Sequence, residues 1–258
     1  MPRIFTFATL YVFLTSLLLT TGCEKKSDPS HSQASPHAKG TIPIDPSTTG
    51  TIVGNVKFTG TPAPRSTIDM ELDPACAFSS KEPQLAESVM VNKGELQNVF
   101  VYVKDGLGDY VFPKPSQPVV LDQLGCRYHP HVLGMVAGQT LHILNSDNTE
   151  HNVHPVPQNN PQWNESQMPH GAPKDRTFNN PELMLPITCN QHPWMKMYVN
   201  VVSNPFFAVS DDKGNFTIQG LPPGTYTIAA VHEKLGTQEM KVTVAPKQNQ
   251  SADFIFKP

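Results

Sequence analysis

The sequence of 258 residues predicts an all-β fold made of two small β-sandwiches. No long stretch repeats apolar residues every 3.6 positions, whereas many short apolar or alternating runs lie between turn residues. The chain also contains 26 prolines and 16 glycines, which suit short strands joined by turns better than helices. Its length is sufficient for the cores of one or two domains.

The charge balance argues against a nucleic-acid partner. Charged residues make up only 16% of the chain, the formal net charge is −3, and no basic block is present. Proteins that bind nucleic acid usually carry a basic patch or stripe.

The N-terminus predicts export to the outside of the cytoplasm. Arg3 precedes an apolar run over 4–19, and small residues follow before Cys23, the layout of a secretory signal over residues 1–23. The Gly22-Cys23 pair resembles a bacterial lipoprotein signal, although Thr20 stands where that family usually has leucine. The resemblance implies a lipidated Cys23 and a protein anchored to a bacterial membrane, on its periplasmic face or at the cell surface. An uncleaved membrane anchor is the alternative.

Residues 24–49 are expected to form a flexible tether. They are rich in Ser, Pro, Thr and Lys and contain almost no large apolar side chains. Such a segment cannot bury enough surface to fold.

Strand-like runs outside the middle of the chain point to one sandwich. They are 50–60, 98–103, 207–218, 220–230, 240–244 and 253–256. Three of their motifs resemble the carboxypeptidase-regulatory-like family of transthyretin-like sandwiches: Gly50-x-Ile52-x-Gly54-x-Val56, Asp212-x-Gly214-x-Phe216 and Leu221-Pro222-Pro223-Gly224-x-Tyr226.

About a hundred residues separate the first two runs from the rest. We therefore predict a discontinuous sandwich over 50–112 and 205–258, with a second domain over 113–204 inserted into it. Two tandem domains with a boundary near Asn204 are the alternative. Within 113–204, short strand-like runs recur at a spacing that suits one further β-sandwich: 119–121, 136, 140–144, 151–156, 183–187 and 197–202.

One loop of this middle domain carries the donor groups of a blue-copper site. Cys189 is followed by His192 and then by Met195, which places a thiolate, an imidazole and a thioether on one short turn. These soft donors favour copper, and His151 is the candidate for the second imidazole. Zinc is a possible metal for a Cys/His site, but a methionine ligand would be unusual for it.

The two segments that hold these residues resemble the copper loops of cupredoxins of the amicyanin and plastocyanin type. The matching residues are the His151-Asn152 pair and the run Cys189-x-x-His192-Pro193-Trp194-Met195. The resemblance implies one type 1 copper bound by His151, Cys189, His192 and Met195. It also implies that Asn152 joins the two loops, and that His192 lies near the surface, where redox partners dock against it, Pro193 and Trp194.

The axial ligand stays open between two methionines. Met195 lies three residues after His192 and Met197 lies five after it, and both spacings occur among cupredoxins. Pro193 favours Met195. Since side chains alternate along a strand, both methionines point to the same side.

The two remaining cysteines, Cys76 and Cys126, are expected to pair. Thiols tend to form disulfides in an oxidising compartment, and Cys23 and Cys189 already have other roles. Two buried free thiols are the alternative.

These features predict a membrane-tethered, extracytoplasmic blue-copper protein that carries single electrons between redox partners. We expect no enzymatic activity and no catalytic residues, because four protein ligands leave no open metal position. A copper store or a carbohydrate-binding-like surface module is the alternative. A domain of a copper oxidase or nitrite reductase would need a second copper, for which His129 and His131 are the only candidates.

Overall fold

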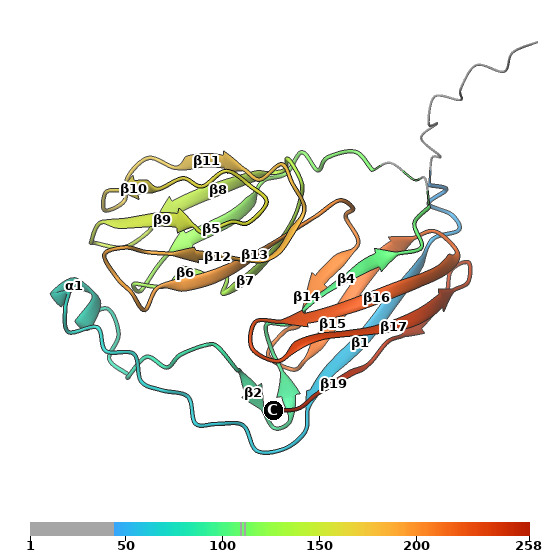
Figure 1. The fold of residues 1–258 in the computed structure, drawn as a ribbon, viewed down its shortest axis with the longest axis horizontal. Helices are drawn as coiled ribbons and strands as arrows, with labels where there is room; N and C mark the ends of the chain where they lie inside the picture. Colours follow the sequence, from blue (N-terminus) through green and yellow to red (C-terminus); the bar gives the residue numbers. More distant parts are fainter. Residues whose placement is uncertain (1–43, 109, 111) are drawn as a thin grey trace, which may run out of the picture. The chain divides into compact units, whose positions relative to one another are not determined.

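The computed structural model describes residues 44–108, 110 and 112–258 (Figure 1). The predicted signal, the lipidated Cys23 and most of the predicted tether lie outside the described residues. The end of that tether, 44–49, differs from the expectation, because Ile44 packs against the first sandwich and Thr48 accepts a backbone hydrogen bond from Lys247. In the described part of the chain, no helix is long and apolar enough to cross a membrane.

The described structure is all-β, and its first sandwich combines strands from both ends of the chain. We call it the outer sandwich. One sheet has the order β15-β1-β3-β2 with β18 and β19 also paired to β1, and the other has the order β14-β4-β16-β17. The strands are β1 (Gly50–Phe58), β2 (Val91–Asn92), β3 (Glu95–Leu96), β4 (Phe100–Asp105), β14 (Phe207–Val209), β15 (Asn215–Leu221), β16 (Gly224–His232), β17 (Gly236–Val244), β18 (Asn249–Ser251) and β19 (Phe254–Phe256).

Each family-like motif of the outer sandwich has a packing reason. A Cβ on Gly54 would lie 2.0 Å from the carbonyl oxygen of Ala252 and 2.4 Å from the ring of Phe216, so only glycine fits in β1. Gly214 has a φ of +71° in the turn before β15, a conformation that glycine adopts without strain. The buried Tyr226 donates a hydrogen bond to the carbonyl oxygen of Pro222, which fixes the bend that leads into β16.

The second sandwich, which we call the inner sandwich, is built from the middle of the chain. One sheet has the order β10-β9-β12-β13-β7 and the other β11-β8-β5-β6. The strands are β5 (Val119–Gln123), β6 (Tyr128–His129), β7 (Val132–Val136), β8 (Thr140–Asn145), β9 (His151–Pro155), β10 (Glu165–Gln167), β11 (Lys174–Thr177), β12 (Glu182–Thr188) and β13 (Lys196–Val202). None of these strands pairs with a strand of the outer sandwich, as a domain inserted between β4 and β14 requires.

The register of the inner sandwich brings two distant segments of the chain together. β9 and β12 run antiparallel, with Thr188 opposite His154. The residues after Thr188 therefore lie beside the residues before His154, which places the loop between β12 and β13 next to the start of β9. Alternate residues of β12, such as Leu185 and Ile187, are fully buried in the core between the two sheets.

Residues 66–87 pack on the inner sandwich, although the sequence placed them in the outer one. We call this segment the cap. Met70 and Cys76 belong to the core of the inner sandwich, and Arg127 donates hydrogen bonds to two residues of the cap, Gln84 and Leu85. The cap contains the one helix of the described residues, the short α1 (Pro74–Ala77), at the left of Figure 1.

A disulfide fixes the cap to the inner sandwich. It joins Cys76 in α1 to Cys126 in the loop between β5 and β6, and both residues are buried. The predicted pairing is therefore present in the structure. Because the two cysteines lie 50 residues apart in the chain, the bond closes a long loop.

Replacing both Cys76 and Cys126 by alanine should therefore destabilise the inner sandwich. The chain entropy of a loop of 50 residues corresponds to about 4 kcal/mol, and losses of about 2–5 kcal/mol are typical. Guanidinium unfolding of the metal-free protein measures the change. The wild type treated with a reductant should unfold at the same concentration as the double variant. Equal stability of the variant and the oxidised wild type would contradict the role of the disulfide.

Candidate metal centre

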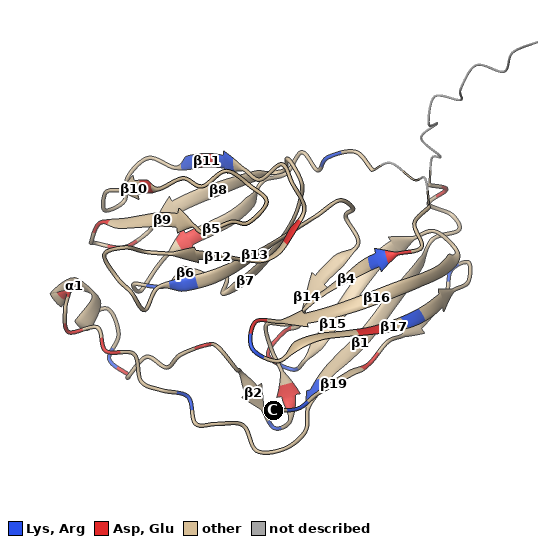
Figure 2. Ribbon diagram, viewed as in Figure 1, with Lys and Arg blue, Asp and Glu red and all other residues tan. Residues whose placement is uncertain are grey.

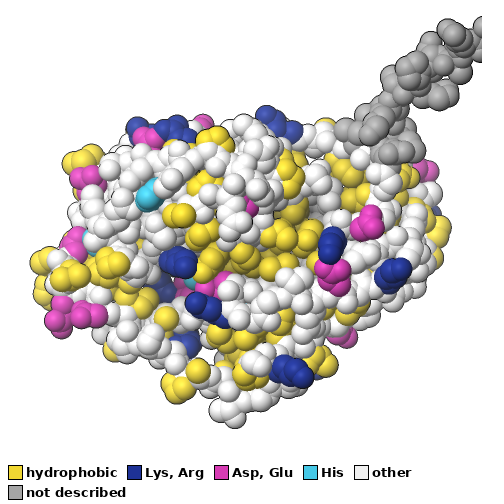
Figure 3. Space-filling model, viewed as in Figure 1, with side chains coloured by type: hydrophobic (Ala, Val, Ile, Leu, Met, Phe, Trp, Pro, Cys, Tyr) yellow, Lys and Arg dark blue, Asp and Glu magenta, His cyan; other side chains and the backbone are white. Residues whose placement is uncertain are grey.

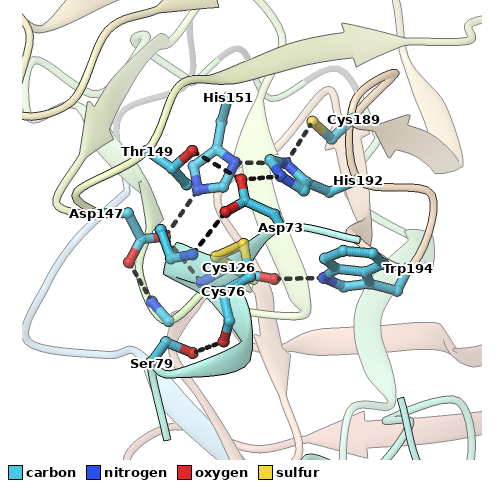
Figure 4. The surroundings of a disulfide bond; sticks show 12 residues. Asp73, Cys76, Ser79, Cys126, Asp147, Thr149, His151, Cys189, His192 and Trp194 are labelled. Carbon is cyan, nitrogen blue, oxygen red and sulfur yellow. Dashed lines mark hydrogen bonds and ion pairs between the residues drawn. A yellow bond between two sulfur atoms is a disulfide. The ribbon is translucent and has the colours of Figure 1, made fainter. Parts of the chain in front are cut away.

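Three of the predicted ligands meet at one end of the inner sandwich (Figure 4). His151 opens β9, Cys189 follows the last residue of β12, and His192 lies in the loop between β12 and β13. Nδ1 of His151 lies 2.9 Å from Nδ1 of His192, and that nitrogen lies 3.6 Å from the sulfur of Cys189. All three side chains are buried, and their donor atoms lie within 4.8 Å of one another.

The loop that carries Cys189 and His192 closes on itself. The backbone N–H of Met195 donates to the carbonyl of His192 at 2.9 Å, and the N–H of Cys189 donates to the carbonyl of Met195 at 3.2 Å. These bonds hold the loop in a compact turn before β13 begins. Met195 and Met197 are both buried in the core of the inner sandwich, as their alternation requires. Which of them faces the other three groups stays a prediction.

Each imidazole is held on its outer side by a carboxylate. Nε2 of His151 lies 2.8 Å from Oδ2 of Asp147, and Nε2 of His192 lies 3.0 Å from Oδ2 of Asp73. An ionised carboxylate only accepts hydrogen bonds, so both Nε2 atoms must carry the proton. In their neutral forms, both histidines therefore present the free lone pair of Nδ1 to the centre of the site.

The two carboxylates are themselves fixed in the ionised state. Burial raises the pKa of Asp147, but hydrogen bonds from His151 and from the backbone N–H groups of Cys126 and Gly125 lower it below its ordinary value. Burial likewise raises the pKa of Asp73, but hydrogen bonds from His192, Thr149 and the backbone outweigh burial and lower this pKa below its ordinary value. Both aspartates are therefore negatively charged at neutral pH.

Two lone pairs 2.9 Å apart repel each other unless a cation lies between them. In the metal-free protein, a proton on one of the two Nδ1 atoms removes this repulsion. Burial lowers the pKa of His151, but the carboxylate of Asp147 and the sulfur of Cys189 together raise it to about 9. A metal ion between the two Nδ1 atoms would remove the repulsion too, because two nitrogen ligands about 2.0 Å from a common metal lie roughly 3 Å apart.

The surroundings of Cys189 favour its thiolate form. Burial raises its pKa, but hydrogen bonds from His151, from the backbone of Asn152 and from His192 outweigh burial and lower it to about 6. The thiolate is the form of cysteine that binds metals. Asn152 lies between the two loops, as the resemblance implied. Its Oδ1 accepts a hydrogen bond from the N–H of Asn190 at 2.8 Å and lies 3.3 Å from the sulfur of Cys189.

His192 lies deeper than the sequence suggested. We expected its imidazole near the surface, but the residue is only 3% exposed because Asp73 and the cap cover it. Of the neighbours expected to form a docking patch, Pro193 is exposed. Trp194 is half-buried and donates a hydrogen bond from Nε1 to the carbonyl of Cys126.

The remaining histidines that the sequence singled out make other contacts. His154 bonds to Asn190 and Gln162 through its two ring nitrogens. His131 bonds to Glu233, and His129 bonds to a backbone carbonyl. None of them belongs to the groups of described residues whose donor atoms could share a metal ion.

Asp147 and Asp73 were not expected from the sequence to contact the candidate ligands. Asp147 could have been found, because it lies four residues before His151 in the same loop. No local motif points to Asp73, because it lies 119 positions before His192 in the chain.

The donor set fits copper. A thiolate and two neutral imidazoles, with a buried methionine nearby in the chain, are the ligands of blue-copper sites, and thioethers favour copper over zinc. The carboxylate partners add the outer hydrogen bonds that metal-bound histidines usually make.

Replacing Asn152 by alanine should loosen the two loops that hold these ligands. The N–H of Asn190 would lose its acceptor, which costs about 1–3 kcal/mol in the free energy of unfolding. Thermal unfolding of the metal-free protein measures the loss. Asn164→Ala is the matched control, because it removes only the exposed acceptor of the Asn152 amide, and it should cost less. An equal effect of both substitutions would contradict the bridging role of Asn152.

Comparisons with known proteins find one family model and several solved structures that match parts of this chain. A family model described as carboxypeptidase regulatory-like domain matches residues 196–257. A mutant of amicyanin in the Cu(I) form is 22% identical, with a TM-score of 0.29, and the match covers 33% of this chain and 81% of that one. A purple cupredoxin from Nitrosopumilus maritimus is 24% identical, with a TM-score of 0.26, over 29% of this chain and 81% of that one.

A copper-containing nitrite reductase from Thermus scotoductus is 18% identical, with a TM-score of 0.32. That match covers 58% of this chain but only 28% of the reductase. Comparison with curated proteins finds no match. The described part of the chain is thus all-β, and its residues 196–257 match a carboxypeptidase-regulatory-like family model.

Proposed function

We propose that this protein is a blue-copper protein that carries single electrons outside the cytoplasm. The observation that carries the proposal is the arrangement of His151, Cys189 and His192. Two imidazoles, each held at Nε2 by a carboxylate, direct their free nitrogens toward each other beside a thiolate of lowered pKa. A copper ion bound there supplies a reversible one-electron couple between Cu(I) and Cu(II).

The protein's own residues keep the site unchanged while the charge of the metal changes. His151 sits on a strand, and Cys189 and His192 lie on a loop that is closed by two backbone hydrogen bonds. Asn152 ties that loop to β9, and the carboxylates of Asp147 and Asp73 prevent the imidazoles from rotating. Ligands fixed in this way need little rearrangement when an electron arrives or leaves.

The proposal includes the absence of catalysis at the metal. His151, His192, Cys189 and one methionine would fill four positions on the metal, and the two histidines and Cys189 are each no more than 3% exposed. A substrate would therefore find neither an open position on the metal nor a path to it.

We further propose that redox partners dock on the cap beside the loop. Because the cap covers His192, the surface nearest to that imidazole includes the exposed side chains of α1 and its neighbours. Leu72 and Phe78 are 81% and 87% exposed, and Asp69 and Glu71 are exposed beside them. Figure 2 marks acidic residues on the ribbon beside α1, and Figure 3 shows acidic and hydrophobic side chains on the same side of the molecule. This surface fits a partner protein with an apolar patch surrounded by basic residues.

Lipidation at Cys23 would hold the protein on the outer side of a bacterial membrane. Residues 24–43 would then act as a tether, since their composition favours an extended chain. A tethered carrier reaches membrane-bound partners at a high effective concentration.

Protein loaded with copper(II) should be blue, because a thiolate bound to copper absorbs visible light by charge transfer. The Cys189→Ser variant should lose the colour, since a hydroxyl is a much poorer donor to copper. Absorption and electron spin resonance spectra measure both forms. His154→Ala, which removes a histidine outside the site, should keep the colour. A colourless wild type, or colour in the Cys189→Ser variant, would rule out the proposed centre.

Leucine substitutions should identify the axial methionine. Met195→Leu should change the visible spectrum and raise the reduction potential, because the loss of a thioether donor disfavours Cu(II). Met197→Leu should leave both unchanged, since it preserves the volume of a fully buried side chain. The reverse pattern would assign the axial position to Met197.

A further inference from the structure

Asp73 makes an unexpected contact with the metal centre. Its Oδ1 accepts the N–H of Ala75 at 2.7 Å, as the N-cap of α1. Its Oδ2 accepts the hydroxyl of Thr149 at 2.9 Å and Nε2 of His192 at 3.0 Å. The same carboxylate thus caps a helix, contacts the loop before His151 and orients a proposed ligand (Figure 4).

The position of this carboxylate is fixed by the disulfide. Cys76 lies three residues after Asp73 and is bonded to Cys126. The backbone N–H of Cys126 donates to Asp147, which holds His151, and the carbonyl of Cys126 accepts the indole N–H of Trp194. One cross-link therefore connects the partners of both imidazoles.

The charge of Asp73 lies where it would act strongly on a metal bound by His192. The side chain of His192 is 4% exposed and that of Asp73 is 22% exposed, so water screens their interaction only in part. A carboxylate that accepts the Nε2 proton makes the imidazole a stronger donor through Nδ1. It also adds a negative charge on the side of His192 that faces away from the metal. Both effects favour the more positive ion, Cu(II), over Cu(I).

We propose that Asp73 is a positioning residue for His192 that lowers the reduction potential of the copper centre. This inference rests on the proposed function, since it concerns the same metal. Asp73 fixes the tautomer and the orientation of the imidazole in the metal-free protein, and its charge stabilises the oxidised site. The cap is thus part of the metal centre, although it lies outside the strands of the inner sandwich.

The first experiment compares Asp73→Asn with Asp69→Asn in the full-length, copper-loaded protein. Both substitutions remove one negative charge from the cap, but Asp69 is exposed and its carboxylate accepts only the N–H of Glu71. Redox titration followed by the blue absorption should show that Asp73→Asn shifts the equilibrium about tenfold toward Cu(I). For a one-electron couple that change equals a rise of about 59 mV. Asp69→Asn should shift the equilibrium by less than about twofold.

The conservative variant Asp73→Glu distinguishes the effect of the lost negative charge from an effect of altered packing in the cap. It keeps the carboxylate and should therefore reverse most of the shift seen with asparagine, so that its potential lies close to that of the wild type. Asp73→Asn with the same potential as Asp69→Asn would overturn the electrostatic part of the proposal. So would Asp73→Glu with the same potential as Asp73→Asn, because the effect would then come from the packing of the cap.

A second measurement needs no copper and keeps the inference distinct from the proposed function. Nuclear magnetic resonance of the metal-free protein should detect the Nε2 proton of His192 as slowly exchanging, because Asp73 accepts it in a buried place. In Asp73→Ala its exchange with solvent should accelerate at least about tenfold. Unchanged exchange would refute the positioning role. A protected proton in a protein that fails to bind copper would refute the proposed function and leave the positioning role intact.

Discussion

The hydrogen bonds between two aspartates and two histidines are the constraint on which the site depends. They leave the proton of each imidazole on Nε2, and so they direct two Nδ1 lone pairs at each other across 2.9 Å. With the thiolate of Cys189 beside them, these nitrogens form a cluster that needs a cation. The sandwich, the loop closure and the cap all serve to hold this arrangement in a buried place.

The fold explains how such a cluster is assembled from distant parts of the chain. The antiparallel pairing of β9 and β12 brings His151 next to the loop of Cys189 and His192. The insertion of the inner sandwich between β4 and β14 leaves the chain between β1 and β4 free to cross over it as the cap. The disulfide then fixes the cap at the end of the inner sandwich that holds His151, Cys189 and His192.

The sequence predicted features that depend on local motifs, but it did not predict contacts between residues far apart in the chain. Most of the longer strands of both sandwiches were predicted, because alternation and turn residues are local signals. The strands that were missed, each of two to four residues, are too short to show alternation: β2, β3, β6, β10, β11 and β18. The cluster of His151, Cys189 and His192 was predicted because Cys189 and His192 share one loop. The burial of His192 was not, because it depends on Asp73, whose surroundings give no sign of a metal and whose position depends on the fold.

A crystal structure of the copper-loaded protein tests the proposed centre most directly. We expect one copper ion bound by Nδ1 of His151, Nδ1 of His192 and the sulfur of Cys189, with Asp147 and Asp73 still bonded to the two Nε2 atoms. Copper at the exposed histidines, or ligation through Nε2 with the aspartates displaced, would contradict the proposed centre.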